Sequence, residues 1–467
     1  MKKQYKRIKR TAMDRLSALP DCLIIHILSF LEVKQSAITA LLSKRWQFLW
    51  TQSPRLIFRQ KRSSIPALQD FVCRVNRTLV IYGQNDLDTF EVEIPYSKSY
   101  SPDVDVWVAF AVKNKAKQVS LLLNHILDEE EDKMYTLPRT MFRSAHLKRL
   151  TLRGCVVAPL GTIEWPSLTE LSIEHSKLEQ HVMDKMLSGC PVLHCLVLIY
   201  CWGFDRLEVS SKSLYELRVS DPDEYDLTTP LLQISAPYLH TLSVTLYPKE
   251  RKLCLENTPS LVRATLDFVC ADWEDKEEMI SNAKELLDKI CHVKVVDLRY
   301  GYMQLLSAVA ISDYPFPQSA RTCLTVEIPL EECSIHVLVG LLESSPKLES
   351  LVIEGSHMYT VRVDTLDIEG SLTYWPCTCL DSKADLDCDL LHLKSIVFKD
   401  FEGPAFVGEL MLTLARMLLN KTPALGKMVV HDERFTSSSQ PAVNESSKIE
   451  QKLLSFPRSS KAVIILK

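Results

Sequence analysis

Glycine is scarce in this chain, with only 12 glycines among 467 residues. It contains no Gly-x-x-x-x-Gly-Lys phosphate loop, no Gly-x-Ser-x-Gly nucleophile turn and no His-Glu-x-x-His metal motif. These motifs supply the phosphate cradle, the nucleophile or the metal ligands of three large enzyme classes. Their absence argues against an enzyme, and we expect no catalytic residue.

Long hydrophobic runs are also missing. No apolar stretch approaches the roughly 20 residues of a membrane span, and the N-terminus lacks the apolar core of a signal peptide. Without such a signal, the 14 cysteines are expected in the reducing nucleus or cytoplasm, or in both. The net charge of −4 gives no nucleic-acid footprint. We therefore expect neither a membrane nor a nucleic acid as a partner.

Cysteine spacing does not favour a metal site. Cys377, Cys379 and Cys388 lack the paired Cys-x-x-Cys or Cys/His pattern of structural zinc. Cys190, His194 and Cys195 lie among leucines of a repeated pattern, where packing or incidental placement is expected. We expect no metal and no cofactor.

The most informative stretch lies near the N-terminus, where three short helices are expected within forty residues. Pro20 suits the first turn of a helix, and Asp21 complements the positive end of that helix. A second helix is expected around Val33 to Leu42, and Ser43 is a suitable N-cap for a third. The first helix has one apolar face, made of Leu23, Ile24, Ile27, Leu28 and Leu31.

Apolar side chains in this stretch exceed what so small a unit can bury by itself. Trp46, Leu49 and Trp50 share one face of the expected third helix. We therefore expect a docking module whose surplus apolar surface is covered by a partner. The alternative is a small helical cap on the following domain, with the tryptophans in its core.

The stretch resembles the F-box, whose pattern is Leu-Pro before an apolar helix and later Leu-Ser-Lys-Arg-Trp with a second Trp. F-box proteins dock on a SKP-family adaptor and so join a cullin-RING ubiquitin ligase. The resemblance implies that the adaptor-binding residues are Leu19, Pro20, Asp21, Leu23, Ile24, Ile27, Leu28, Leu31, Leu42, Ser43, Lys44, Arg45, Trp46, Leu49 and Trp50.

A second pattern, Leu-x-x-Leu-x-Leu or a close variant, repeats after the F-box. Its first leucines are Leu147, Leu168, Leu193, Leu214 and Leu239, spaced by 21, 25, 21 and 25 residues. This period is typical of leucine-rich repeats, which stack because no single repeat buries its apolar face. A distant copy begins at Leu348, and looser copies are Leu87/Phe90/Val92, Ala116/Val119/Leu121, Leu261/Ala264/Leu266, Val293/Val296/Leu298 and Cys323/Val326/Ile328.

Between these strands, helices are expected over 178–187, ending near Gly189, and over 274–290. Cys155 and Cys201 occupy the Asn/Cys position that follows a repeat strand, and we expect them in the repeat core.

The C-terminal part changes character. A strand over 391–398, a helix over 409–419 and a strand over 422–430 resemble the FBD module that ends many plant F-box proteins with leucine-rich repeats. Ser-rich residues 435–449 are expected to form a mobile loop, and 453–467 a final strand. The module would cap the open end of the repeats.

The predicted fold class is α/β: a three-helix F-box, an irregular leucine-rich-repeat solenoid and an FBD-like cap. The predicted boundaries are 1–13 for a basic flexible tail, 14–54 for the F-box, 55–365 for the repeats, 366–434 for the cap and 435–467 for the remainder. Six Lys and Arg residues crowd the first ten positions, and they form either a nuclear-import signal or a solvated tail.

The resemblance implies a substrate-recognition subunit of an SCF-type ubiquitin ligase. Its F-box would bind the adaptor, and its repeats would bind a target whose identity the sequence does not give. Two other functions stay open at this point. One is a scaffold or competitor that binds the adaptor without a degradation target, and the other is a receptor that senses a small ligand on its repeats.

Overall fold

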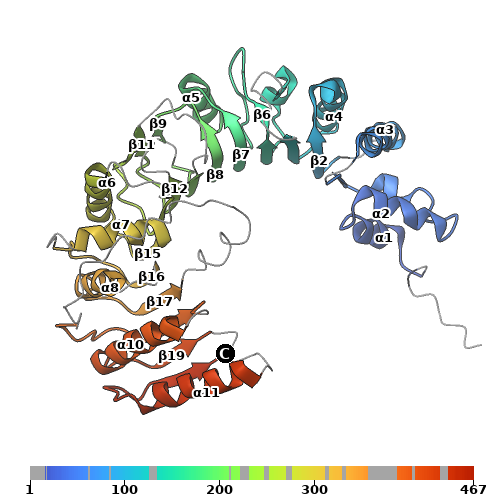
Figure 1. Cartoon of the computed structure of the whole chain (residues 1–467). Helices are drawn as coiled ribbons and strands as arrows, with labels where there is room; N and C mark the ends of the chain where they lie inside the picture. Colours follow the sequence, from blue (N-terminus) through green and yellow to red (C-terminus); the bar gives the residue numbers. More distant parts are fainter. Residues whose placement is uncertain are drawn as a thin grey trace, which may run out of the picture. The chain divides into compact units, whose positions relative to one another are not determined.

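The computed structural model describes residues 16, 18–61, 64–83, 86–125, 134–209, 212–220, 231–246, 252–269, 276–310, 315–328, 333–355, 386–401, 405–431 and 440–467. Helices alternate with parallel strands along these residues, which confirms the α/β class (Figure 1). The chain divides into two compact units, with the boundary near residue 176.

The first unit begins with the predicted docking module, which contains the helices α1 (Asp21–Leu28) and α2 (Val33–Ile38). The 3-10 turn η1 (Thr39–Leu41) ends the second helix earlier than expected. The prediction of a third α-helix starting at Ser43 is wrong. A chain of turns leads instead to the 3-10 helix η2 (Leu49–Gln52).

Backbone bonds explain this difference. The Trp46 N–H donates to the Ser43 carbonyl at 3.0 Å, and the Leu49 N–H donates to the Trp46 carbonyl at 3.3 Å. Three-residue spacing of this kind places side chains at i and i+3 on one side. Trp46 and Leu49 are both buried as a result, and Phe48 between them is exposed.

The rest of the first unit consists of parallel coils. Its strands follow one another in the order β1 (Arg55–Arg59), β2 (Thr89–Tyr96), β3 (Gln118–His125), β5 (Arg149–Arg153) and β7 (Glu170–Lys177). Helices α3 (Ile65–Ile81) and α4 (Ser101–Lys113) and the 3-10 helices η3 (Lys98–Tyr100) and η5 (Arg139–Arg143) lie between them, with a small sheet of β4 (Tyr135–Thr136) and β6 (Cys155–Val156).

The two repeats predicted near the start of the array, those of Phe90 and Val119, are confirmed, because these two residues pair with each other between β2 and β3. The array starts one strand earlier than expected, because Leu56 of β1 pairs with Phe90.

Within its described residues, the second unit continues the same design with ten parallel strands of the main sheet. They are β8 (Cys195–Trp202), β10 (Glu216–Ser220), β12 (Thr241–Leu246), β14 (Arg263–Phe268), β15 (Val295–Leu298), β16 (Cys323–Ile328), β17 (Ser350–Gly355), β18 (Ser395–Lys399), β19 (Lys427–Val430) and β20 (Val463–Leu466).

One expected copy is out of register. Cys323, Val326 and Ile328 were expected to hold the three apolar positions of the repeat. The structure pairs Leu324 with Val296 and Val326 with Leu298, so the pattern lies two residues earlier. Its first position, elsewhere usually a leucine, is therefore occupied by Arg321, whose side chain is fully buried.

Helices cover one face of these strands (Figure 1). They are α5 (Gln180–Gly189), α6 (Lys276–Lys289), α7 (Tyr300–Ala310), α8 (Cys333–Glu343), α10 (Ala405–Lys421) and α11 (Gln440–Ser455). The helices expected over 178–187, 274–290 and 409–419 are thus confirmed within the described residues.

The loop expected over 435–449 is wrong for the described part, since α11 begins at Gln440. Ile449 and Leu453 lie one helical turn apart on α11, and both are buried. Helix α11 contacts α10, so tertiary packing of this apolar stripe outweighs the Ser-rich composition. The expected final strand is shorter than predicted and covers only β20.

Three coils of the second unit carry a small outer sheet, ordered β13 (Lys252–Glu256), β11 (Leu231–Ser235) and β9 (Arg206–Glu208). Carboxamide side chains cover both of its edges. The Gln180 side chain accepts from the Arg206 N–H at 3.1 Å and donates to the Arg206 carbonyl at 3.0 Å. Asn282 does the same for Leu253, at 3.3 and 2.8 Å. Each amide replaces a neighbouring strand and satisfies an edge that is otherwise unpaired.

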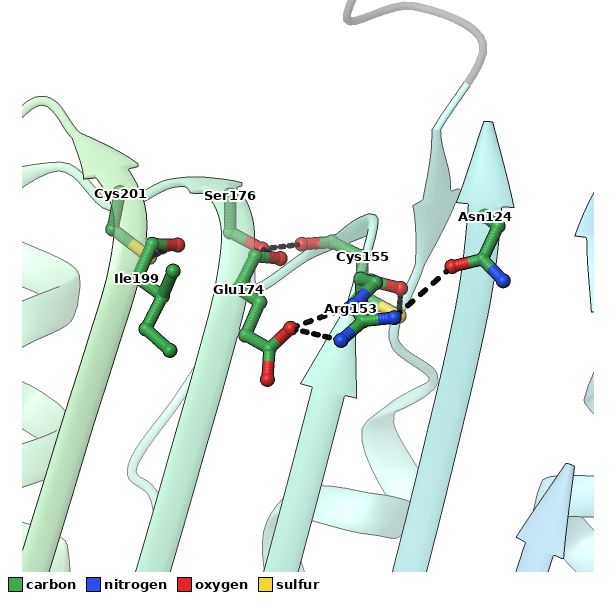
Figure 2. A network of polar contacts seen from close by, with 7 residues as sticks. All are labelled: Asn124, Arg153, Cys155, Glu174, Ser176, Ile199 and Cys201. Carbon is green, nitrogen blue, oxygen red and sulfur yellow. Dashed lines mark hydrogen bonds and ion pairs between the residues drawn. The ribbon is translucent and has the colours of Figure 1, made fainter. Parts of the chain in front are cut away.

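Cys155 and Cys201 are buried, as predicted for repeat-core residues. Each thiol lies 3.5 Å from the carbonyl two residues before it, that of Arg153 or Ile199 (Figure 2). Burial raises the pKa of the Cys155 thiol to about 12, which keeps it protonated and unreactive. Cys377 and Cys379 lie outside the described residues.

Candidate docking surface

The first helix of the docking module starts at a proline. Pro20 has φ −59° and ψ 149° and directly precedes α1, and its carbonyl accepts from the N–H groups of Leu23 and Ile24 at 3.0 and 3.1 Å. Its missing N–H costs nothing in the first turn. From this start, the helical period turns Ile24 inward and Leu23 outward.

A four-residue core holds the module together. Ile24, Leu28, Trp46 and Leu49 are each at most 6% exposed and pack together. The predicted adaptor-binding residues therefore fall into two groups. These four are buried by packing inside the module, and the others lie around or outside this core. Around this core, the partly buried side chains are Leu19, Ile25, Leu31 and Trp50.

An ion pair joins the two halves of the F-box pattern. The Arg45 guanidinium donates from Nε to Asp21 Oδ1 at 2.8 Å and from Nη2 to the Leu19 carbonyl at 2.5 Å. The side chains of Arg45 and Asp21 are 39% and 57% exposed, so the pair adds little stability by Coulomb attraction alone. Its geometric effect is to fix the start of α1 against the turn that carries Trp46.

The outer surface of the module is apolar. Three predicted adaptor-binding residues lie on it, namely Leu23 at 48%, Ile27 at 41% and Leu42 at 65% exposure. Pro20, Ser43 and Lys44 are exposed as well. Downstream of Pro20, four further large side chains that were not among the predicted adaptor-binding residues are more than half exposed: Phe30, Ile38, Leu41 and Phe48.

A sequence signal for these four residues exists. Each is a large hydrophobic residue that falls outside the inward face of its helix or turn, and such a residue has no internal role. Exposed single hydrophobics are ordinary, but a group of this density in one small module indicates an interaction site.

Backbone and side-chain bonds attach the module to the first repeat coil of its unit. The Tyr82 hydroxyl, at the end of α3, donates to the Ser53 carbonyl at 2.8 Å. Gly83 N–H donates to the Thr51 carbonyl at 3.4 Å. Burial, aided by Asp88, raises the pKa of Tyr82 to about 12, so the phenol remains a donor at neutral pH. The module is therefore held to β1 and α3 by its last turn, and its exposed apolar side chains stay free of those bonds.

A second feature of interest lies on the strand face of the second unit. The Arg299 guanidinium is 3.2 Å from Asp297 and 3.0 Å from Glu354, and Lys399 is 2.8 Å from Glu354. Burial raises the pKa of Asp297, and Glu354 and Glu327 raise it further, while Arg299 acts in the opposite direction. This network joins neighbouring coils and is stabilised by the two cations.

Chemically, the docking surface offers apolar contact. Within the described part of the chain, no group of three His, Cys, Asp or Glu side chains could hold a metal ion. No helix in that part is long and apolar enough to cross a bilayer.

Known proteins show the same two parts. Residues 16–58 match the F-box domain model, and residues 104–286 match the model of the leucine-rich repeats of the FBD-associated F-box protein At5g56370. The putative F-box/LRR-repeat protein At5g02930 of Arabidopsis thaliana is 27% identical over 448 residues, 91% of this chain and 89% of the relative. The F-box/LRR-repeat protein At4g14096 of the same plant is 27% identical over 97% of this chain and 94% of its own length.

Proposed function

From the F-box and the leucine-rich repeats that this chain contains, we propose that it is the substrate-recognition subunit of an SCF-type ubiquitin ligase. The F-box docks on a SKP-family adaptor and, through it, on a cullin. The repeats hold the target protein, and the chain acts in the nucleus, the cytoplasm or both. The chain itself makes and breaks no bond. It raises the effective concentration of a target lysine near the conjugating enzyme.

The observation that carries this proposal is the exposed apolar surface of the F-box. Leu41 and Phe48 are 86% and 63% exposed, although each is a residue type that is normally buried. Burying one such side chain contributes about 1.5–3 kcal/mol before the cost of association is subtracted. A few of them are enough for a stable complex, because a handful of residues carries most of the energy of an interface.

The test is co-purification and calorimetric titration of the full chain with a SKP-family adaptor. We choose Leu41→Asp and Phe48→Asp because both side chains lie outside the four-residue core, so a loss of binding is not a loss of folding. The expected result for either variant is binding weaker by about two orders of magnitude, equal to about 3 kcal/mol.

Ile65→Asp is the matched control, since Ile65 is also a large side chain with 71% exposure, but lies on α3 outside the F-box. It should bind the adaptor like the unchanged chain. Full adaptor binding by both F-box variants would contradict the docking surface. No binding of the unchanged chain to any adaptor would refute the ligase function.

A ligase subunit differs from a scaffold in that its bound target is degraded. In cells, a protein that co-purifies with the repeats should accumulate when the cullin is inhibited. A partner whose abundance stays constant would favour the scaffold or competitor.

A further inference from the structure

Five consecutive coils of the second unit align a row of side chains at the start of their strands. Backbone bonds fix this alignment: Tyr215 N–H donates to the His194 carbonyl at 2.9 Å, His240 N–H to the Tyr215 carbonyl at 3.1 Å, and Val262 N–H to the His240 carbonyl at 2.9 Å. Lys294 follows Val262, because Val295 pairs with Arg263 in the next register position. The row stands just before the inner strands β8, β10, β12, β14 and β15.

Three rings of this row stack on one another. His194 and Tyr215 have centroids 5.2 Å apart and planes 2° apart, and Tyr215 and His240 are 4.6 Å apart at 14°. Tyr215 is still 45% exposed, and since both of its faces are covered by imidazoles, its edge and hydroxyl are what reach solvent. Ring edges carry positive partial charge.

Cations surround the rings. Lys212 Nζ lies 5.7 Å from the ring centre of Tyr238, which is 39% exposed. The side chains of Arg263 and Lys294 are exposed and make no hydrogen bond or ion pair with any residue that the structure describes.

Charge in these segments is one-sided. Residues 192–195, 212–218, 236–243, 258–265 and 292–295 contain four Lys or Arg residues and one carboxylate, Glu216. Glu216 is paired with Arg218 at 3.3 Å, so three cations are left without an acidic partner in these segments. Of these three, Arg263 also acts on Asp297 of β15, whose pKa it lowers. This excess is local, because the chain as a whole has a net charge of −4. We call the set of His194, Tyr215, Tyr238, His240 and Val262 with Lys212, Arg263 and Lys294 the ring rim.

We propose that the ring rim docks an acidic, extended segment of the target protein. Carboxylates of that segment meet Lys212, Arg263 and Lys294, and its apolar side chains lie on the exposed parts of Tyr238 and Val262. The inference rests on the proposed function, because the acidic segment is taken to belong to the target protein that the repeats hold. Charge complementarity selects the acidic partner, and aromatic residues with Arg are the side chains enriched in protein interfaces.

A single-stranded nucleic acid is the other partner that basic and aromatic side chains attract. Such binding depends on bases stacking on open ring faces. Both faces of Tyr215 are already covered by histidines, so an anionic peptide fits this surface better.

The test uses fluorescence anisotropy with the full chain and a fluorescein-labelled peptide of alternating Glu and Leu as the probe. The matched peptides replace Glu by Gln or by Lys. We expect the Glu peptide to bind at least about tenfold more tightly than the Gln peptide, to weaken as salt is raised, and the Lys peptide not to bind.

Arg263→Glu combined with Lys294→Glu should weaken binding of the Glu peptide by at least about tenfold. Arg77→Glu is the control, since Arg77 is an exposed cation on α3 outside the ring rim, and it should bind the Glu peptide normally. Tyr238→Ala should also weaken binding, because the apolar side chains lose a contact.

Equal binding of the Glu and Gln peptides, or full binding by the double variant, would overturn the proposal. Tighter binding of a labelled single-stranded RNA that the same double variant abolishes would also overturn it, in favour of a nucleic-acid surface. Adaptor binding of each variant is measured in parallel. It reports on the F-box alone, so failure of the ring rim and failure of the ligase function give different results.

Discussion

Arg321 offers a direct test of the energetics inside the repeats. Its guanidinium is fully buried at a position where the neighbouring coils have Val293 and Leu348. Among the residues that the structure describes, only Nη1 has a hydrogen-bond partner, the Ser345 hydroxyl at 3.5 Å, and Nε and Nη2 have none. Replacement by an apolar side chain should therefore stabilise the second unit. A buried charge without good partners commonly costs more than a well-packed hydrophobic residue.

The magnitude follows from the pKa of this group. Burial lowers the pKa of Arg321 from 12.5 to about 10, which corresponds to a penalty of about 3 kcal/mol on the charged form. Leucine is shorter than arginine, and the space that it leaves costs about 1 kcal/mol. We expect Arg321→Leu to raise the free energy of unfolding by about 2 kcal/mol, or the melting temperature by about 4–8 °C.

The assay is thermal and urea unfolding of the full chain, with hydrogen exchange to localise the change to α7, α8 and β16. Arg321→Met is a second variant that follows the arginine stem more closely, and it should also stabilise. Arg321→Ala is the control, because its larger cavity should cancel the gain. Destabilisation by both Leu and Met would refute the reasoning and show that the guanidinium makes a net favourable contribution.

Three smaller changes test other parts of the fold. Asn282→Leu should cost about 1–3 kcal/mol in urea unfolding, because both backbone groups of Leu253 lose their partner; an unchanged midpoint would argue against a role in covering the sheet edge. Asp297→Asn should raise the melting temperature at pH 7.5, and this gain should shrink as the pH is lowered toward 4. Burial raises the pKa of Asp297 in the folded state above its unfolded value, so the unchanged protein loses stability as the pH rises between these two pKa values. A pH-independent gain would contradict this cause. Tyr82→Phe should cost about 1 kcal/mol and speed amide exchange near the end of the F-box, since the bond to the Ser53 carbonyl is lost; equal exchange rates would rule out this link.

The local sequence pattern was enough to predict the main helices and strands. Pro20 with the apolar period after it predicts α1, because a helix start and an inward face depend on neighbouring residues only. The recurring positions of Leu150, Leu171 and Leu196 predict short buried strands, since each repeat has the same core positions to fill. These strands exist and lie in parallel coils.

The structure differs from the sequence-based prediction where an element depends on residues that are distant in sequence. Helix α11 forms in a Ser-rich segment because Ile449 and Leu453 find buried positions in the last coils. The register of β16 is fixed by pairing with β15 and β17, and only that pairing reveals Arg321 at a leucine position.

The two functional surfaces likewise combine features that the sequence predicts with features that depend on distant contacts. The surplus of apolar side chains in the N-terminal module over what it can bury follows from the amino-acid sequence, because that balance depends on composition and length. The places of Trp46 in the core and Leu41 on the surface emerge from the folded chain alone, since a 3-10 spacing and not an α-helical one orients the last turns. Likewise, His194, Tyr215 and His240 are separate in sequence, and parallel stacking of coils in register is what brings their rings into contact.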